Sequence, residues 1–209
     1  MQSVSALDTL GCILVAYALG CFATGYYMVR ARTGLDIREF ESGSSGARNV
    51  SRVLGKTGFA LTFLGDFAKG ALAVWAVRHF SGSNSLTALA MVCVVAGHIW
   101  PISLHFRGGK GAATSLGALL VYDPHLALAF FVCFLPGLVL LRKLTVPGLA
   151  AYVCLPVASY WLHRNPVETF FLSAVSVSII FAHRQNIIRE FPMLATRFGP
   201  STKPHPPKP

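Results

Sequence analysis

The residues best suited to chemistry lie near the middle of the chain, in Gly97–Ser115, which reads GHIWPISLHFRGGKGAATS. There Lys110 is set among Gly108, Gly109 and Gly111, directly before a helix-forming stretch. Glycines let backbone N–H groups approach a ligand, and a helix N-terminus adds unpaired donors and a positive dipole end. This combination predicts a phosphate site, although the spacing is not that of a nucleotide P-loop. The alternative is a flexible surface loop whose lysine meets lipid head groups.

A second candidate stretch, Glu41–Arg52, is rich in serine and glycine. Small residues there permit a nest of backbone donors, to which hydroxyl and amide side chains add hydrogen bonds. Arg48 and Arg52 are four residues apart, so in a helix they would share a face and form a fork for phosphate oxygens. A linker with ordinary membrane-surface arginines is the alternative. The other candidate binding residues of this stretch are Ser42, Gly43, Gly46 and Asn49.

A third polar stretch follows the last apolar run and contains His183, Asn186 and Arg189. In a helix that continues this run, His183 and Asn186 would align at i and i+3. A histidine and an amide on one face are suited to gripping a polyol or a phosphate. The alternative is a helix end at which polar residues meet water and lipid head groups.

The composition indicates what positions these stretches. Hydrophobic residues make up 54% of the 209 residues and charged residues 12%, against about 25% charged in soluble domains. The chain is therefore expected to be an all-α, polytopic membrane protein. Membrane topology explains most of the net charge of +10, so no nucleic-acid partner is expected. The five cysteines lie in apolar runs without metal-ligand spacing and are interpreted as small buried hydrophobes, so neither a metal nor a cofactor is predicted.

Seven membrane segments are expected from the apolar runs, the first of them a span and not a signal peptide. They are Leu10–Val29, Thr57–Val77, Ser85–Leu104, Gly111–Tyr122, Pro124–Leu141, Val146–Leu162 and Val167–Ala182. The fourth segment is too short to cross alone. With seven segments most Lys and Arg residues fall on one side, whereas merging the fourth and fifth removes this bias. The positive-inside rule then places the N-terminus outside and the C-terminus in the cytoplasm.

The same rule brings the three polar stretches to one cytoplasmic face. Residues 1–198 are expected to form a single integral-membrane domain, and the Pro-rich residues 199–209 a disordered tail. Asp66 and Lys69 lie at i and i+3 within the second segment, where each charge needs a partner, so we interpret them as an ion pair. His98, near the end of the third segment, is either a hydrogen-bonding residue at a helix end or a site residue.

Taken together, these stretches resemble the bacterial PlsY family, the integral-membrane acyl-phosphate:glycerol-3-phosphate acyltransferases. The matching residues are Ser42-Gly43, Gly46-Ala47, Asn49-Val50, Arg52, Leu54-Gly55-Lys56, Asp66, Lys69-Gly70, Gly97-His98-Ile99, Pro101, Gly108-Gly109-Lys110-Gly111, Ala113-Thr114, His183-Arg184 and Asn186-Ile187. The match runs in order from about Asp36 to Arg189. The chain departs from the family pattern at Ser44 and Arg48, where Asn and Thr are usual, and at Gln185, where Glu is usual; Phe191–Arg197 lacks a recognisable Gly-x-Glu.

The resemblance implies acyl transfer from acyl phosphate to the 1-hydroxyl of glycerol 3-phosphate at the cytoplasmic face of the bacterial inner membrane, giving lysophosphatidate and phosphate. It implies that Ser42, Arg52, Lys110, His183 and Asn186 act in catalysis. Gly43, Gly46, Arg48, Asn49, Gly108, Gly109, Gly111 and Thr114 are the expected binding residues. No Asp or Glu is well placed in the sequence as a base, so a donor phosphate oxygen and His183 are the two candidate proton acceptors. A membrane transporter or binding protein for a phosphorylated organic anion is the rival interpretation.

Overall fold

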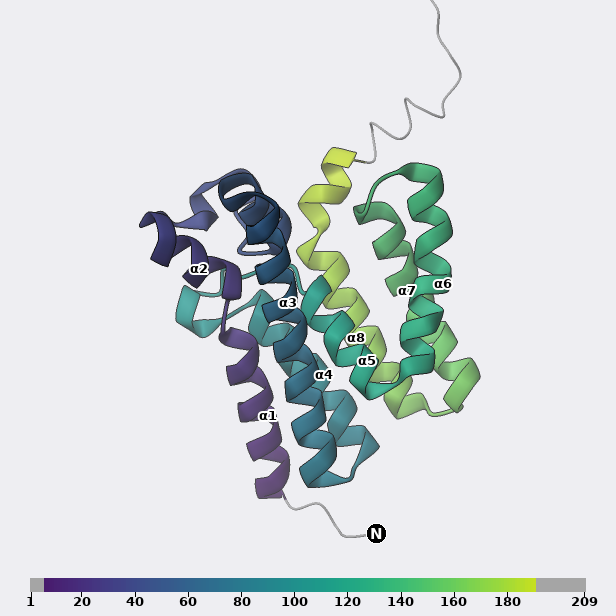
Figure 1. Ribbon diagram of the computed structural model, residues 1–209. Coiled ribbons are helices and arrows are strands. Elements are labelled where there is room, and N and C mark those ends of the chain that lie inside the picture. Colours follow the sequence, from purple (N-terminus) through teal and green to yellow (C-terminus); the bar gives the residue numbers. More distant parts are fainter. Residues whose placement is uncertain (1–5, 191–209) are drawn as a thin grey trace, which may run out of the picture.

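The structure is a computed structural model that describes residues 6–190 (Figure 1). Helices are the regular secondary structure of these residues, which agrees with the predicted all-α class. The α-helices are α1 (Ala6–Cys21), α2 (Thr24–Thr33), α3 (Ala47–Ser81), α4 (Asn84–Ile99), α5 (Ala112–Tyr122), α6 (Pro124–Leu141), α7 (Thr145–His163) and α8 (Pro166–Ala182). Two short 3-10 turns, η1 (Ile37–Glu39) and η2 (Ile102–Leu104), lie in the connections. The expected Pro-rich tail, 199–209, lies outside the described residues.

Within residues 6–190, five helical stretches are long and apolar enough to cross a membrane. They become six if α8 and the following helix, Arg184–Glu190, count as one span bent by 57°. Large apolar side chains such as Val139 and Leu140 are exposed on the outer surface of the bundle, as expected of a lipid-facing surface. The five cysteines, which all lie within residues 6–190, form no disulfide. Cys133 and Cys154 lie exposed and not buried as expected, because the helix faces that carry them point outward.

The predicted first span is not one continuous helix, because the chain breaks at Phe22–Ala23 between α1 and α2. Lys69 Nζ donates to the carbonyl oxygens of Gly20 (2.9 Å) and Phe22 (2.5 Å), which the break leaves without helical partners. The same ammonium group lies 3.3 Å from Asp66 Oδ1. The interpretation of Asp66 and Lys69 as an ion pair is therefore confirmed, and the pair also stabilises the break.

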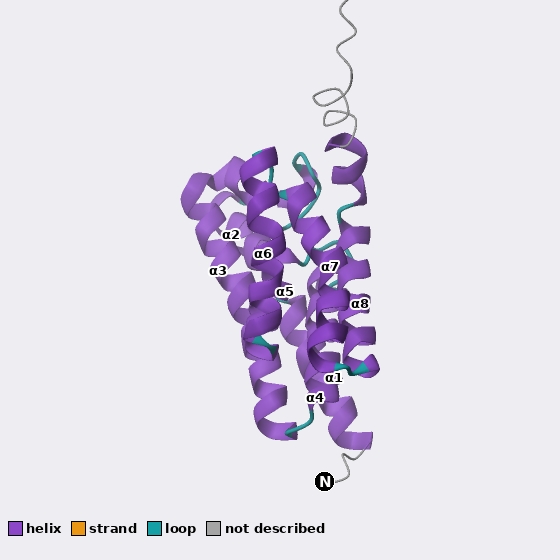
Figure 2. Ribbon diagram, turned by 90° about the vertical axis from the view of Figure 1, so that its right-hand side faces the viewer, coloured by secondary structure: helices purple, strands orange, loops and turns teal. Residues whose placement is uncertain are grey.

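The short helix α5 is enclosed by other helices, as both views show (Figures 1 and 2). It has eleven residues, in agreement with the short fourth segment of the sequence. Gly70 of α3 lies against the carbonyl of Thr114, and Gly117 of α5 lies against the carbonyl of Phe67, so that a Cβ at either glycine would clash with backbone. These contacts bring α3 and α5 to close approach, and the protein around α5 replaces the lipid that it is too short to span.

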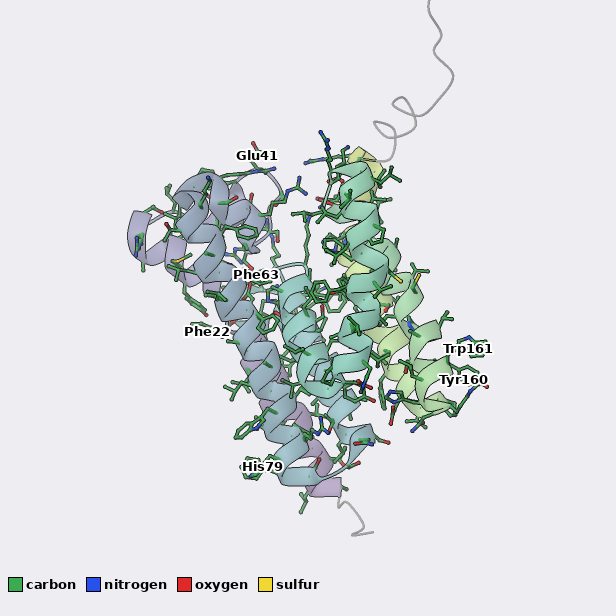
Figure 3. The ribbon with its side chains drawn as sticks, turned by 45° about the vertical axis from the view of Figure 1, so that its right-hand side comes forward. Phe22, Glu41, Phe63, His79, Tyr160 and Trp161 are labelled. Carbon is green, nitrogen blue, oxygen red and sulfur yellow. The ribbon has the colours of Figure 1, made fainter. Side chains whose placement is uncertain are left out.

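The described chain begins and ends at opposite ends of the bundle (Figure 1). The start of α1 lies at one end, whereas α2, the connection to α3 and the helix Arg184–Glu190 lie at the other. In Figure 3, Glu41 marks this second end and His79, near the end of α3, marks the first. The second end is therefore where the polar stretches can meet.

Candidate active site

The three polar stretches line one cavity of about 640 Å³. Its polar half comes from the start of α3, the glycine-rich connection before α5 and the helix Arg184–Glu190. Its apolar half comes from α3, α5, α6 and α7. The polar side chains are those of Ser42, Ser44, Arg48, Asn49, Arg52, Asp66, Lys110, Thr145, His183, Asn186, Arg189 and Glu190. The apolar side chains include Phe59, Phe63, Leu116, Phe130, Phe131, Phe134, Leu149 and Tyr152.

The first polar stretch is held in shape by Asn49. Its amide Nδ2 donates to the carbonyl oxygens of Ile37 (2.9 Å), Phe40 (3.0 Å) and Ser44 (2.9 Å). Because Asn49 is also 2% exposed, this amide shapes the connection between η1 and α3. Helix α3 then begins at Ala47, so Arg48 and Arg52 are helical, as their placement on one helix face requires.

Arg48 and Arg52 lie in the first turns of α3, and both line the cavity. Each is paired with a carboxylate. Arg52 donates to Glu41 Oε2 at 2.8 Å, and an Arg48 nitrogen lies 3.5 Å from Glu190 Oε1. Both arginines are well exposed: 43% of the Arg52 side chain and 61% of the Arg48 side chain are accessible to solvent. They are therefore accessible to an anionic ligand from solution.

The glycine-rich connection is folded against the end of α4. The N–H of Gly108 donates to Ile99 O (3.1 Å) and the N–H of Gly109 donates to His98 O (3.0 Å). A Cβ at Gly109 would clash with the buried imidazole of His98, so the connection lies directly on this ring. Of this connection, only Lys110 lines the cavity. Two of the glycine amides expected to face a ligand, those of Gly108 and Gly109, are therefore engaged by α4 carbonyls instead.

Lys110 joins this connection to the end of the chain. Its Nζ donates to Asn186 Oδ1 at 2.6 Å. Burial, together with the neighbouring cations Arg48 and Arg189, lowers the pKa of Lys110 to about 8. A lysine in this state is charged at neutral pH and is poorly neutralised by the protein, so it is suited to binding an anion.

His183 lies at the bend between α8 and Arg184–Glu190, so the predicted continuous helix is interrupted there. Its Nδ1 lies 2.8 Å from the carbonyl oxygen of Ile179. Since a carbonyl only accepts, Nδ1 carries the proton and a neutral ring leaves Nε2 as an acceptor. Burial lowers the pKa of His183. Asn186 N donates to His183 O (2.8 Å), which starts the new helix.

Glu190 is a charged cavity residue that the sequence reasoning missed. It lies one turn beyond Asn186, and Thr145 donates to its Oε1 at 2.9 Å. The signal was present, since His183, Asn186 and Glu190 repeat at i, i+3 and i+7, the spacing of one helix face. Extending the predicted face by one turn would have found it.

Several predicted binding residues do not line the cavity: Gly43, Gly108, Gly109, Gly111 and Thr114. Gly43 and Gly111 adopt positive φ angles of 63° and 84° and shape turns. Thr114 is fully buried where α5 meets α3. The other predicted site residues all line the cavity. The first two stretches are also joined directly, since Ser45 N donates to Gly108 O at 3.2 Å.

Comparison with known proteins agrees with this arrangement. The family model described as glycerol-3-phosphate acyltransferase matches residues 10–192. Glycerol-3-phosphate acyltransferase 1 of Desulfitobacterium hafniense (strain Y51) is 46% identical over 175 residues, which cover 84% of this chain and 87% of that protein. The glycerol-3-phosphate acyltransferase of Clostridioides difficile (strain 630) is 39% identical over 84% of this chain and 88% of its own.

Two crystal structures of PlsY, an integral membrane glycerol 3-phosphate acyltransferase, share the fold. The glycerol 3-phosphate form has a TM-score of 0.80 and 29% identity, covering 91% of this chain and 98% of that one. The lysophosphatidic acid form has a TM-score of 0.77 at the same identity, covering 88% and 92%. This similarity and the apolar helices identify a multi-pass membrane protein, and the chain belongs to the glycerol-3-phosphate acyltransferase family.

Proposed function

We propose that this protein transfers an acyl group from acyl phosphate to the 1-hydroxyl of sn-glycerol 3-phosphate, giving lysophosphatidate and inorganic phosphate. The observation that carries the proposal is the divided cavity, in which cations face aromatic and aliphatic side chains across one space. Such a cavity suits two phosphorylated substrates and one acyl chain. The solved PlsY structures are a glycerol 3-phosphate form and a lysophosphatidic acid form. These two molecules are the acceptor and the acylated product of the proposed reaction.

The donor phosphate would be bound by Arg52 and Lys110, with Ser42 at the edge of the same group. These side chains would also stabilise the phosphate as it leaves, because their charges are already in place when the negative charge develops. The acyl chain would lie in the apolar half of the cavity. Gly108 and Gly109, whose amides are bonded to α4 carbonyls, would contribute by holding Lys110 in place and not by binding phosphate.

The acceptor would be oriented by His183 and Asn186. The 1-hydroxyl oxygen attacks the acyl carbon, the new C–O ester bond forms and the bond from the acyl carbon to the phosphate oxygen breaks. The hydroxyl proton passes to a base, either His183 Nε2 or an oxygen of the donor phosphate. Direct attack needs no acyl-enzyme, and within residues 6–190 no base is hydrogen-bonded to Ser42 that would activate it as a nucleophile.

For the topology, we propose seven membrane segments formed by α1 with α2, α3, α4, α5, α6, α7 and α8. The N-terminus would lie outside and the C-terminus in the cytoplasm, with the cavity facing the cytoplasm of a bacterial inner membrane. The path of the chain and the clustering of cations around the cavity end support this proposal. Residues 1–198 would form one integral-membrane domain.

The test is a reconstituted reaction with purified protein, synthetic acyl phosphate and glycerol 3-phosphate, in which released phosphate and lysophosphatidate are both measured. Equal amounts of the two products are expected. With acyl-CoA or acylated acyl carrier protein as the donor, neither phosphate nor lysophosphatidate should form. Uptake of glycerol 3-phosphate into protein-containing vesicles without acyl transfer would instead identify a transporter.

A further inference from the structure

The polar half of the cavity is rich in hydrogen-bond donors. Arg48, Arg52, Lys110 and Arg189 donate only, and Asn186 Oδ1 is engaged by Lys110. Donors satisfy a phosphate, but a polyol phosphate also carries hydroxyl groups, and each buried hydroxyl needs an acceptor. The substrate therefore requires acceptors in the same cavity.

The cavity also holds the hydroxyls of Ser42, Ser44 and Thr145 and the carboxylate of Asp66, which is paired with Lys69. Two further acceptors lie at and beyond the bend that follows α8. His183 Nε2 is one turn before Asn186, and the Glu190 carboxylate is one turn after it. His183 lies at the end of α8, adjoining the membrane helices that form the apolar half of the cavity. Glu190 lies farther along the chain, beside the start of α7. The two acceptors thus mark the inner and outer parts of the polar half.

The carboxylate of Glu190 is anchored through one oxygen only. Oε1 accepts from Thr145 Oγ1 at 2.9 Å and lies 3.5 Å from an Arg48 nitrogen. Oε2 is buried and has no hydrogen-bond partner within residues 6–190. A buried carboxylate oxygen without a donor is unfavourable, so this atom is suited to a donor that arrives with the substrate.

We propose that Glu190 Oε2 accepts a hydrogen bond from the hydroxyl of glycerol 3-phosphate that is not acylated, and so selects a phosphorylated polyol as acceptor. The inference rests on the proposed acyl transfer. An acyl chain in the apolar half places the reacting 1-hydroxyl on the inner side, near His183, which leaves the 2-hydroxyl nearer Glu190. A carboxylate also repels two phosphorylated substrates, so it favours binding only where the substrate supplies a donor.

The test compares two acceptors, sn-glycerol 3-phosphate and 3-hydroxypropyl phosphate, which differ only in the 2-hydroxyl. With saturating acyl phosphate, kcat/KM of the native protein should favour glycerol 3-phosphate by about 10- to 100-fold, the usual effect of one hydrogen bond to a charged group. In Glu190→Gln the preference should fall to within about threefold, because Thr145 and Arg48 hold the amide oxygen and turn the NH2 group toward the hydroxyl. This variant should use 3-hydroxypropyl phosphate at least as well as the native protein does, since the repulsion is removed.

The matched control is Glu39→Gln, which removes one exposed carboxylate that does not line the cavity. It should keep both the rate and the preference. Thr145→Val provides a second variant should Glu190→Gln not elute as a folded protein. It should lose part of the preference because the carboxylate is then no longer anchored through Oε1 in the position that presents Oε2 to the substrate.

The proposal is overturned if the folded Glu190 variant, or Thr145→Val in its place, retains the full preference. It is also overturned if both acceptors lose the same factor, because the carboxylate would then have only a structural or electrostatic role. Failure of the underlying function is distinct from either outcome: in that case the native protein forms no acylated product from either acceptor.

Discussion

The pKa of Lys110 makes its role directly testable. Burial and the neighbouring cations lower this pKa to about 8. The ammonium group should then be about nine-tenths protonated at pH 7 and about one-tenth protonated at pH 9. If the charged form binds the donor phosphate, kcat/KM for acyl phosphate should fall about tenfold between these pH values. The sign follows from the lysine losing its positive charge as the pH rises.

Few other groups of the reaction titrate in this range. A phosphate monoester has a second pKa of about 6 and is already a dianion above pH 7. Burial lowers the pKa of His183 from its ordinary 6.5, so the ring is neutral throughout. Lys110→Arg therefore isolates the effect, because a guanidinium stays protonated across this whole pH range and should abolish the alkaline fall. Lys110→Met should lower kcat/KM by about 10²- to 10³-fold at pH 7.

The assay is initial-rate release of phosphate by purified protein at fixed glycerol 3-phosphate, from pH 6.5 to 9.5, with an enzyme-free blank at each pH for hydrolysis of the donor. An alkaline fall of the same size in Lys110→Arg would refute the assignment. So would a native profile that is flat across pH 8.

Three further predictions follow from the same contacts. Arg52→Met should lower kcat/KM for acyl phosphate by about 10- to 100-fold in the phosphate-release assay, as expected for loss of one phosphate-binding cation; an unchanged value would remove it from the site. Gly109→Ala should inactivate the protein because its Cβ would clash with the buried imidazole of His98, whereas Gly11→Ala, whose Cβ meets no atom within 4 Å, should retain activity. Lys69→Met should lower the free energy of unfolding in detergent by about 3–5 kcal/mol because Asp66 is left as an unpaired buried charge. A free energy of unfolding equal to that of the native protein within error would argue against this pair.

The helices were largely predictable because a membrane span is a continuous apolar run. Pro124–Leu141 was predicted with the bounds that α6 has, and the predicted fifth, sixth and seventh segments lie within a residue of α6, α7 and α8 at both ends. The short α5 was also expected. The break at Phe22–Ala23 was not, because its backbone carbonyls are bonded by Lys69, which is 47 residues from Phe22. Local apolarity carries no information about such a partner.

The candidate site was predicted better in its side chains than in its backbone. Cations and polar side chains that repeat on a helix face can be found from spacing, and Arg48, Arg52, Lys110, His183 and Asn186 all line one cavity. Glycine spacing shows that a backbone can bend, but not which atoms its N–H groups will bond. The loop amides were expected to face a ligand, but those of Gly108 and Gly109 instead bond to carbonyls at the end of α4.

This difference changes how the site binds anions. A nest of backbone amides carries no titratable group, so phosphate binding to it would be insensitive to alkaline pH. Here the amides of Gly108 and Gly109 are engaged within the fold, and the charge that faces the cavity belongs to side chains, one of them the partly buried Lys110. Affinity for phosphorylated substrates must then follow the protonation of that lysine, and a mutation in the glycine connection acts by moving Lys110. The alkaline limb of the pH profile therefore distinguishes a side-chain site from a backbone cradle.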